Sequence, residues 1–488
     1  MKILRPAYFR VTFLSLSARG TSFTAEPDAF RRIVRQGSHM TTPTTPQIPT
    51  ASAAASLGGD GPNLDTAMHE PTPTEAFRAQ ASPRRGFVFF VVLAMVGAGA
   101  AQMSAALLTL TLKATELNAD AATTIISISS GIAGILTLFA LPIIGSLSDR
   151  SRSRFGRRRP FLFAGAVSFA IGGILLVAAL NTWMFVTAHI FITIGFVATG
   201  IVTIALIADQ LPPNRRGVAS AFVSLGTPMG ALLGTAIALP FGADLVPLVG
   251  IPTALAVIAL LVLAIVIRDP QFEERRASRS LRELLGIFWV NPIKFPDFAA
   301  VFTSRMLVFS GVAALNGYQA IYLLMNIGLE PAELGGAILL TVIVNTGVSL
   351  AVAPAIGKLS DRLGVRKPFI FAAAVILGAG LVFAAMAPDF GVYLIACGVV
   401  ALGQGVYFAV ELALATRVVP DPENPAKDLA IIKIADNLPV SIVSALAPAI
   451  LAIGVGAAGG QNFAALFVIG AASAVLGGFA ILFVRSAR

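Results

Sequence analysis

The chain has 488 residues, of which 56% are hydrophobic and only 12% are charged. A soluble globular protein carries about 25% charged residues, so this composition, with a mean hydropathy of +0.83, excludes that class and predicts an integral membrane protein. The net charge of +10 does not indicate nucleic-acid binding, because the basic residues lie in short loops beside apolar segments and not along one soluble face.

The first 85 residues form a predicted tail. They contain no long apolar run, and the stretch from Thr41 to Pro83 is rich in Thr, Pro, Ala and Ser. A segment of this composition cannot bury enough apolar surface to offset the entropy lost on ordering. We expect residues 1–85 to be a disordered tail on the cytoplasmic side.

Twelve apolar segments follow Arg85, and each reaches the roughly 20 residues that a helix needs to cross the hydrocarbon core. They fall at residues 87–112, 121–148, 160–180, 183–208, 217–241, 247–267, 298–325, 334–357, 368–387, 390–416, 429–454 and 462–484. The sequence therefore predicts an all-α membrane protein with twelve transmembrane helices in two six-helix repeats. These are an N-terminal bundle over residues 86–268 and a C-terminal bundle over residues 298–488, joined by a charged cytoplasmic linker over residues 269–297.

Basic residues indicate which side of the membrane each loop occupies. When the loops are assigned to alternate faces from Arg84 onwards, one face collects the loop arginines and lysines, and the other carries only Lys113. Short loops rich in Lys and Arg remain in the cytoplasm. We therefore expect both termini on the cytoplasmic side of the plasma or inner membrane.

One loop motif occurs twice, once in each half of the chain. The first copy runs from Gly145 to Phe161 and the second from Gly357 to Phe369. A motif that returns in the same place among the spans indicates two copies of one structural unit. The matching positions, 212 residues apart, are Gly145, Ser148, Asp149 and Arg150 in the first copy and Gly357, Ser360, Asp361 and Arg362 in the second.

Polar residues are unevenly distributed among the spans. The third, sixth, ninth and twelfth spans contain almost none, and the other eight contain several each. Because a lipid-facing polar group has no hydrogen-bond partner, the four apolar spans are predicted to lie at the periphery and the others around a polar path. Alternatively, single Ser and Thr residues merely bond to their own helix backbone. The candidate path residues are Gln102, His189, Asn316, Gln319, Tyr322, Asn345, Gln404, Tyr407 and Asn437.

Four charged residues lie within spans at similar depth from the cytoplasmic ends. Arg305 is in the seventh span, Glu411 in the tenth, and Lys433 and Asp436 in the eleventh. An unpaired charge at such a position costs roughly 2.5 to 3.5 kcal/mol or more, so we expect the four to pair with one another. The sequence leaves three roles open for the cluster: a gate, a proton-coupling site or a structural tie.

The repeated Gly-x-x-x-Asp-Arg loop between the second and third spans of each half resembles that of the major facilitator superfamily. The longer form from Ser148 to Phe161 is similar to the version in plant sucrose transporters and in the glycoside-pentoside-hexuronide:cation symporters. Arg305 at the start of the seventh span, and the run from Asp436 to Pro439 in the eleventh, are similar to bacterial members of that group. The resemblance implies the major facilitator fold and secondary transport by alternating access.

The resemblance also implies a latch between the halves on the cytoplasmic side in the outward-open state. Asp149 would meet the N-terminus of the eleventh span and Asp361 that of the fifth, where free N–H groups and the helix dipole favour an anion. Arg157 or Arg158 would pair with Asp209. The implied latch residues are Gly145, Asp149, Arg150, Gly156, Arg157, Arg158, Asp209, Gly357, Asp361 and Arg362.

We expect a secondary transporter that moves a small polar solute, a sugar or glycoside, across the membrane by proton symport. Amide, hydroxyl and aromatic groups along the path suit hydroxylated neutral solutes. Melibiose-type relatives bind their coupling cation with carboxylates in early helices, but the first two spans here contain no Asp or Glu. This favours a proton gradient over sodium, with Asp436 or Glu411 as the proton site. The alternative is proton-driven efflux of drugs or other apolar compounds, which the same fold supports.

The sequence offers little for catalysis or metal binding. His39, His69 and His189 are scattered, Cys397 is the single cysteine and lies in an apolar run, and no phosphate-binding loop is present. We therefore expect no enzymatic activity, cofactor or metal site, and we expect Cys397 to pack as a small hydrophobe. The expected partners are a small-molecule solute and the lipid bilayer, with no nucleic acid, and the expected state is a monomer.

Overall fold

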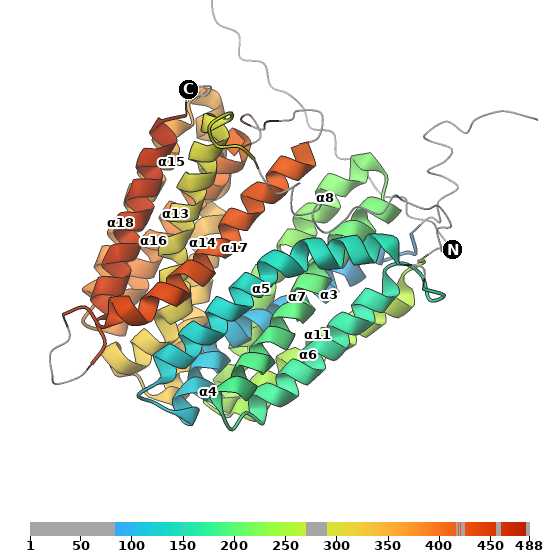
Figure 1. Ribbon diagram of the computed structural model, residues 1–488, viewed down its shortest axis with the longest axis horizontal. Helices are drawn as coiled ribbons and strands as arrows, with labels where there is room; N and C mark the ends of the chain where they lie inside the picture. The colour runs from blue at the N-terminus through green and yellow to red at the C-terminus, as the bar shows by residue number, and fades with distance from the viewer. Residues whose placement is uncertain are drawn as a thin grey trace, which may run out of the picture. The chain divides into compact units, whose positions relative to one another are not determined.

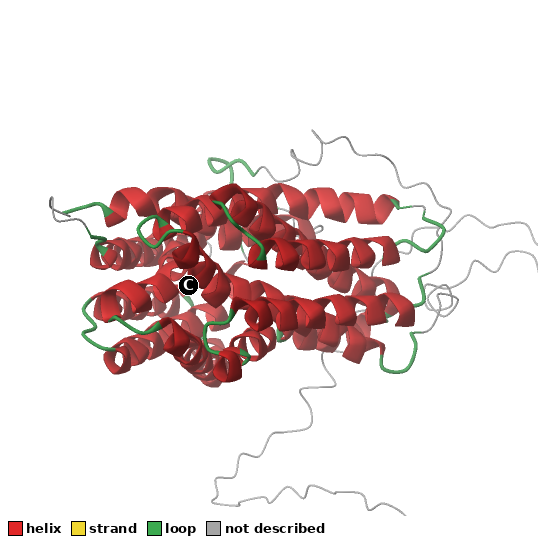
Figure 2. Ribbon diagram, turned by 90° about the horizontal axis from the view of Figure 1, so that it is seen from below, coloured by secondary structure: helices red, strands yellow, loops and turns green. Residues whose placement is uncertain are grey.

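The computed structural model describes residues 83–151, 153–269, 290–415, 418, 420, 425–454 and 460–484. Over these residues all regular secondary structure is helical (Figures 1 and 2). Within the described ranges, twelve helices are long and apolar enough to cross a membrane, which confirms the predicted fold class. Residues 1–82 of the predicted tail and residues 270–289 of the predicted linker lie outside the described residues.

Six spans make up the N-terminal half, hereafter the N-half. Its elements are α3 (Phe87–Ser104), the π-helical turn η2 (Ala105–Thr109), α4 (Leu110–Leu117), α5 (Ala122–Arg150), α6 (Arg159–Val177), α7 (Thr182–Gln210), α8 (Pro213–Ser224), α9 (Gly226–Ala236), α10 (Ala238–Phe241) and α11 (Leu245–Val266). The first span joins α3, η2 and α4, and the fifth joins α8, α9 and α10. Side-chain caps begin two of the helices: Asn181 accepts from the Met184 backbone in α7, and Asp244 accepts from Val246 in α11.

The C-terminal half, hereafter the C-half, repeats this plan with longer helices. Its elements are α13 (Pro296–Tyr322), the π-helical turn η3 (Leu323–Ile327), α14 (Pro331–Leu363), α15 (Lys367–Ala385), α16 (Phe390–Ala415), α17 (Pro425–Leu451) and α18 (Phe463–Leu482). Gly364, with a φ of 68°, ends α14 in the left-handed conformation, and Pro368 lies in the first turn of α15. The sequence thus stops one helix and starts the next within a few residues.

The sequence repeat extends to the positions at which helices bend most easily. Pro142 lies inside α5 and Pro354 inside α14, again 212 residues apart. An interior proline removes one backbone hydrogen bond and favours a kink. The second span of each half therefore carries its weak point in the same place, about one turn before the repeated motif.

The halves meet along α5 and α17, which face each other between the two groups of helices in Figure 1. Near the middle of α5, a Cβ added at Gly134 would collide with the Ser441 side chain of α17. A second contact joins α10 to α14, where a Cβ at Gly335 would collide with Ala238. Small residues therefore let the helices of opposite halves approach closely.

The four spans with few polar residues, now α6, α11, α15 and α18, pack mainly against helices of their own half. This placement agrees with the predicted peripheral position of the third, sixth, ninth and twelfth spans. The first, fifth, seventh, eighth and tenth spans are left to face the space between the halves.

Candidate functional site

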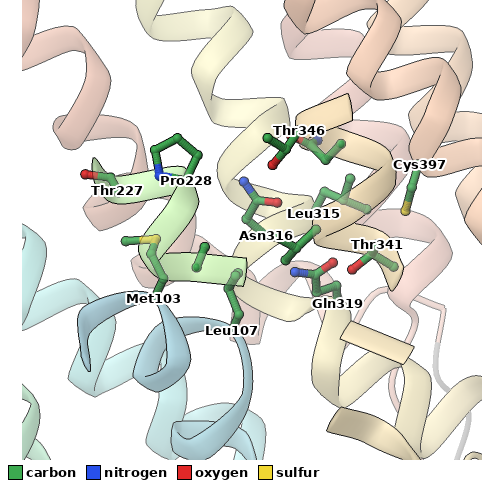
Figure 3. Close-up of a pocket in the computed structure, with 13 residues that line it drawn as sticks. Met103, Leu107, Thr227, Pro228, Leu315, Asn316, Gln319, Thr341, Thr346 and Cys397 are labelled. Carbon is green, nitrogen blue, oxygen red and sulfur yellow. The ribbon is translucent and has the colours of Figure 1, made fainter. Parts of the chain in front are cut away.

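A cavity of about 240 Å³ lies between the halves (Figure 3). Helices α3 and α9 and the turn η2 line it from the N-half, and α13, α14 and α16 line it from the C-half. The N-half lining residues are Met103, Leu107, Thr227, Pro228 and Ala231, and those of the C-half are Leu315, Asn316, Gln319, Thr341, Val342, Asn345, Thr346 and Cys397.

The two walls of this cavity differ in chemistry. The N-half wall is mainly apolar, with Met103, Leu107 and Pro228 on the opposite side of the cavity from Asn316 and Gln319 (Figure 3). The C-half wall presents amide and hydroxyl groups, and none of the described residues that line the cavity carries a charge. Because amides and hydroxyls both donate and accept hydrogen bonds, the cavity suits an uncharged solute with one hydrogen-bonding face and one apolar face.

Three of the nine predicted path residues line the cavity: Asn316, Gln319 and Asn345. A fourth, Gln404, lies behind them, and its Oε1 accepts a hydrogen bond from Asn345 Nδ2 at 2.9 Å. This bond fixes the orientation of the Asn345 amide. Cys397 is buried, as expected of a small hydrophobe, and also contributes to this wall.

The other predicted path residues lie elsewhere. His189 is buried within the N-half, where its Nδ1 lies 2.7 Å from Ser129 Oγ. Tyr322 is fully buried within the C-half; its hydroxyl donates to the Ala384 carbonyl at 2.9 Å and its ring packs among other aromatic rings. Both side chains are therefore satisfied inside one half. Gln102, Tyr407 and Asn437 are likewise not among the residues that line the cavity.

The charged residues within the spans form a buried cluster in the C-half. Arg305 of α13 donates through Nη1 to Glu411 of α16 and through Nε to Asp436 of α17. The side chains of Arg305 and Glu411 are 6% and 1% exposed, and that of Asp436 is 18% exposed. The pairing expected from the sequence is present for these three residues. The side chain of Lys433 lies outside the described residues.

In this cluster Arg305 is shared by two acids, Glu411 and Asp436, that differ in exposure. The guanidinium of Arg305 also lies 5.1 Å from the centre of the Phe309 ring, within the range of a cation–π contact. Asp436 is the more exposed of the two acids.

The N-half loop, defined as residues 151–158 between α5 and α6, is organised by Arg158. Its side chain is 4% exposed and donates to Ser148 Oγ at 2.6 Å and to Asp209 at 2.9 Å. Asp149 accepts from Arg158 at 2.9 Å and from Arg157 at 2.6 Å, although its side chain is 47% exposed. Arg158 thus joins the end of α5 to the end of α7. In this structure these contacts of Asp149 and Asp209 lie within the N-half.

The C-half loop, defined as residues 364–366 between α14 and α15, carries Arg366 at the position that corresponds to Arg158. Arg366 lies 3.6 Å from Asp361, whose side chain is 72% exposed. The remaining predicted latch residues lie on the same helix ends: Gly145 and Arg150 on α5, Gly156 in the N-half loop, and Gly357 and Arg362 on α14. The structure therefore places both copies of the motif at one end of the bundle, hereafter the basic end.

Contacts between the halves occur at the opposite end of the bundle. Ser127 Oγ of α5 lies 2.7 Å from the Tyr318 hydroxyl of α13. Closer to the start of α5, Thr123 Oγ1 donates to Gln461 Oε1, before α18, at 2.5 Å. These two hydrogen bonds, together with the Gly335 contact, hold the halves together away from the basic end.

The sequence matches the Major Facilitator Superfamily over residues 87–353 and again over residues 301–488. These ranges cover all twelve membrane spans of the described structure. The chain belongs to the Major Facilitator Superfamily. It is therefore a multi-pass membrane protein, and a transporter of small molecules by its family.

Curated relatives match this Major Facilitator Superfamily protein over part of their length. The multidrug resistance protein MdtG of Escherichia fergusonii is 29% identical and that of Escherichia coli K12 (strain DH10B) is 27% identical, each over 246 residues. The match covers 49% of this chain and 56% of each relative. The chain thus spans about half the length of the curated relatives that it matches.

Solved transporter structures share the fold over most of the chain. The nucleoside transporter NupG has a TM-score of 0.60 at 16% identity, covering 80% of this chain and 98% of its own. A D-xylose-proton symporter has a TM-score of 0.60 at 18% identity, covering 82% and 98%. A bacterial homolog of the human lysosomal transporter Spinster, inward-facing and unoccupied, has a TM-score of 0.59 at 15% identity, covering 82% and 96%. At these identities the likeness shows the fold alone.

Sequence reasoning missed the apolar wall of the cavity and one residue at the basic end. Met103, Leu107 and Pro228 gave no signal, because an apolar side chain in a span looks the same whether it faces lipid, core or cavity. Asp269 was assigned to the linker, but its carboxylate accepts hydrogen bonds from the backbone of the N-half loop. An acid directly after an apolar span was the available signal.

Proposed function

We propose that this Major Facilitator Superfamily member is a proton-coupled symporter of a small uncharged solute of the sugar or glycoside class. The observation that carries the proposal is the cavity between the halves, whose polar groups are all neutral amides and hydroxyls. Such groups replace the hydrogen bonds that a hydroxylated solute makes with water. A charged solute would lose its hydration there without gaining a counter-charge.

The opposite wall supports the same class of solute. Met103, Leu107 and Pro228 provide an apolar surface, and a sugar ring or the aglycone of a glycoside has C–H faces that pack on such a surface. The volume of about 240 Å³ is below the roughly 300 to 1,000 Å³ of pockets for drug-sized ligands. In this conformation the volume fits a small solute better than a bulky drug.

The buried cluster of the C-half supports coupling to protons. We assign the transported proton to Asp436, because it is more exposed than Glu411 and shares Arg305 with it. In this mechanism the proton arrives at Asp436, weakens its ion pair with Arg305, and leaves Glu411 as the remaining partner. The change in charge pairing biases the equilibrium between two arrangements of the helices.

The basic end and the contacts between the halves support an orientation in the membrane and an inward-open conformation. With the basic end in the cytoplasm, both termini are cytoplasmic, and the hydrogen bonds of Ser127 and Thr123 close the external side. The described structure then corresponds to an inward-open state of a monomer in the cell membrane. Transport requires that these external contacts break while the N-half and C-half loops close the cytoplasmic side.

Uptake into proteoliposomes tests the solute class. Purified protein under an inward proton gradient should accumulate at least one labelled monosaccharide or glycoside from a panel. Asn316→Ala and Gln319→Ala should each raise the half-saturating concentration roughly threefold to tenfold, because each removes a hydrogen bond worth about 0.5 to 1.5 kcal/mol. Asn214→Ala, which removes an exposed amide outside the cavity, should not. Accumulation of no neutral hydroxylated solute would refute the proposal.

The coupling is tested by separating accumulation from exchange. Asp436→Asn keeps the size of the side chain but cannot titrate, so it should abolish uphill accumulation while solute exchange across the membrane continues. Glu411→Gln should reduce exchange as well, because it removes the fully buried partner of Arg305. If Asp436→Asn still concentrates solute under a proton gradient, the proton does not bind at Asp436.

A second candidate function is proton-driven efflux of apolar compounds. The apolar N-half wall favours it, and so does the partial likeness to the multidrug resistance protein MdtG. The same proteoliposomes, loaded with a lipophilic dye, distinguish the two functions. Proton-dependent dye efflux without sugar uptake would establish the second function, and sugar uptake without dye efflux would establish the first.

A further inference from the structure

Asp269 lies directly after α11 and contacts the loop that carries the family motif. Its Oδ2 accepts hydrogen bonds from two consecutive backbone N–H groups, those of Arg158 at 2.5 Å and Arg159 at 2.9 Å. These residues begin α6, where N–H groups have no partner within the helix. A carboxylate distant in sequence therefore caps the helix that follows the N-half loop.

The conformation of the N-half loop is fitted to this carboxylate. Gly156 has a φ of 107°, in the region that favours glycine. A Cβ at this position would lie 2.6 Å from Asp269 Cγ, too close for any side chain. Glycine at 156 thus serves two needs, because it allows both the turn of the chain and the approach of Asp269.

Two further bonds fix the end of α11 at this place. Arg159 Nη2 donates to the Ile267 carbonyl at 2.6 Å, and Gln210 Nε2, at the end of α7, donates to the Arg268 carbonyl at 2.9 Å. The segment from Ile267 to Asp269 is therefore held by both α6 and α7. Asp269 cannot shift without breaking bonds to more than one helix.

The C-half has the counterpart of the bond from Arg159 to the end of α11, but its described residues have no counterpart of the contact between Asp269 and Gly156. Lys367, the counterpart of Arg159 in the repeat, donates to the Val484 carbonyl at the end of α18. Gly364, the counterpart of Gly156, also has a positive φ, of 68°, but a Cβ there would meet nothing within 4 Å. In the described part of the chain, a carboxylate packs against this glycine position in the N-half alone.

We propose that Asp269 is a positioning residue for transport, which acts through Arg158. By holding the Arg158 and Arg159 backbone, it places the Arg158 side chain between Asp149 and Asp209. This inference rests on the proposed function, in which the N-half loop closes the cytoplasmic side of the outward-open state. Without Asp269, the start of α6 shifts, Arg158 loses its position, and the equilibrium moves toward the inward-open state.

Cysteine labelling measures this equilibrium without any solute. All labelling is done in one Cys397→Ser, Thr123→Cys background, so that the lost hydrogen bond of Thr123 to Gln461 is common to every rate compared, and uptake is measured in chains that keep Cys397 and Thr123. The cysteine at position 123 becomes accessible to an impermeant thiol reagent from outside only when the external contacts open. Asp269→Ala should reduce the labelling rate at least threefold and the uptake rate about tenfold. Asp269→Asn keeps an acceptor oxygen and should recover at least half of both. Asp244→Ala removes the cap at the other end of α11 and should leave both rates within twofold.

The labelling and uptake results test the positioning role of Asp269 separately from the proposed transport of a sugar. Unchanged labelling in Asp269→Ala, with or without loss of uptake, would overturn the positioning role, because a merely structural defect does not shift the equilibrium between states. Reduced labelling would support it even if no sugar proves to be the solute, since labelling requires none. If the parent protein takes up no sugar, that result would instead count against the proposed function.

A pair of glycine variants provides a check that does not alter the carboxylate. Gly156→Ala should lower labelling as much as Asp269→Ala does, and the double variant should be no worse than either single variant, because both act on one contact. Gly364→Ala strains a similar backbone without meeting another atom and should lower labelling less than twofold. Equal effects of the two glycine variants would mean that backbone strain, and not Asp269, is responsible.

Discussion

The two loops that carry the repeated motif are alike in sequence and unlike in their contacts. In the N-half loop, the Arg158 side chain is 4% exposed and contacts both Asp149 and Asp209. In the C-half loop, Arg366 lies 3.6 Å from Asp361; the Arg366 side chain is 13% exposed and that of Asp361 is 72% exposed. Charge-assisted hydrogen bonds contribute about 1.5 to 3 kcal/mol each, whereas an ion pair with an exposed partner contributes about 0 to 1 kcal/mol. The same motif therefore makes shorter contacts to less exposed acids in the N-half than in the C-half.

The difference arises from segments outside the motif. The end of α11 supplies a carboxylate, Asp269, to the backbone of the N-half loop, whereas the end of α18 supplies the carbonyl of Val484 to the side chain of Lys367. A repeated motif thus shows where a loop lies in the fold. Its rigidity depends on what the neighbouring helix end offers.

The largest difference between the halves is expected at the arginines. Arg158→Ala removes a buried guanidinium and leaves Asp149 and Asp209 without it, so it should destabilise the folded protein by about 2 to 4 kcal/mol. Arg366→Ala should cost less than Arg158→Ala, because the 3.6 Å pair with Asp361 is longer than the pairs of Arg158 and Asp361 is 72% exposed. Thermal unfolding of the two variants in detergent measures both. Equal shifts of the unfolding midpoint would remove the contrast between the loops.

A difference in transport is expected at the aspartates of the motif. Asp149→Ala should lower uptake at least tenfold while folding stays nearly intact, because a contact at a helix end contributes about 0.3 to 2 kcal/mol, enough to bias two states. Asp361→Ala should lower uptake less than threefold. Initial rates in vesicles, normalised to the amount of inserted protein, compare them. A larger effect at Asp361 would show that the C-half loop controls the equilibrium.

A smaller difference is expected at the serines. Ser148 is fully buried and accepts from Arg158 at 2.6 Å, so Ser148→Ala should cost about 1 to 3 kcal/mol. Ser360 donates to the Val365 carbonyl at 2.9 Å within its own turn, and Ser360→Ala should cost about 0.5 to 1.5 kcal/mol. Unfolding midpoints again provide the measurement. The reverse order would mean that the bond from Arg158 to Ser148 adds little.

The smallest effect concerns ionic strength. At 1 M salt the screening length falls to about 3 Å, from about 10 Å at 0.1 M. The effect of Arg366→Ala on the unfolding midpoint should then fall by a larger fraction than that of Arg158→Ala, because Asp361 is 72% exposed whereas Asp209 is 33% exposed. Midpoints recorded at both salt concentrations test this. Equal loss of the two effects would place the Arg158 pairs in solvent.

The fold could be predicted from the sequence because membrane spans and their ends leave local signals. Apolar length defines the twelve helices, and Asn181, Asp244 and Gly364 mark where individual helices begin or end. The pairing of Arg305 with two acids also followed from residue types alone, since a charge in a span needs a partner.

The candidate site was harder to predict, because it depends on how each helix is rotated. Asn316, Gln319 and Asn345 face the cavity, but His189 and Tyr322 bond to groups within their own half. A polar residue in a span indicates that its side chain has a hydrogen-bond partner, but it does not indicate whether that partner is a solute in the cavity or a group within the same half. Apolar lining residues give no signal, and a cap formed by a residue as distant in sequence as Asp269 gives none in the loop that it holds.

The close crossing of α5 and α17 at Gly134 and Ser441 divides α5 into a shorter and a longer segment. At 1.5 Å of rise per residue, the crossing lies about 18 Å from Ala122 and about 24 Å from Arg150. For an α5 that pivots there without bending at Pro142, each 1 Å of separation at the Ala122 end becomes roughly 1.3 Å of travel at the Arg150 end; a bend at Pro142 would take up part of this travel. The longer segment ends at the N-half loop, so a small parting of the hydrogen bonds of Thr123 and Ser127 is amplified where Arg158 joins the helix ends.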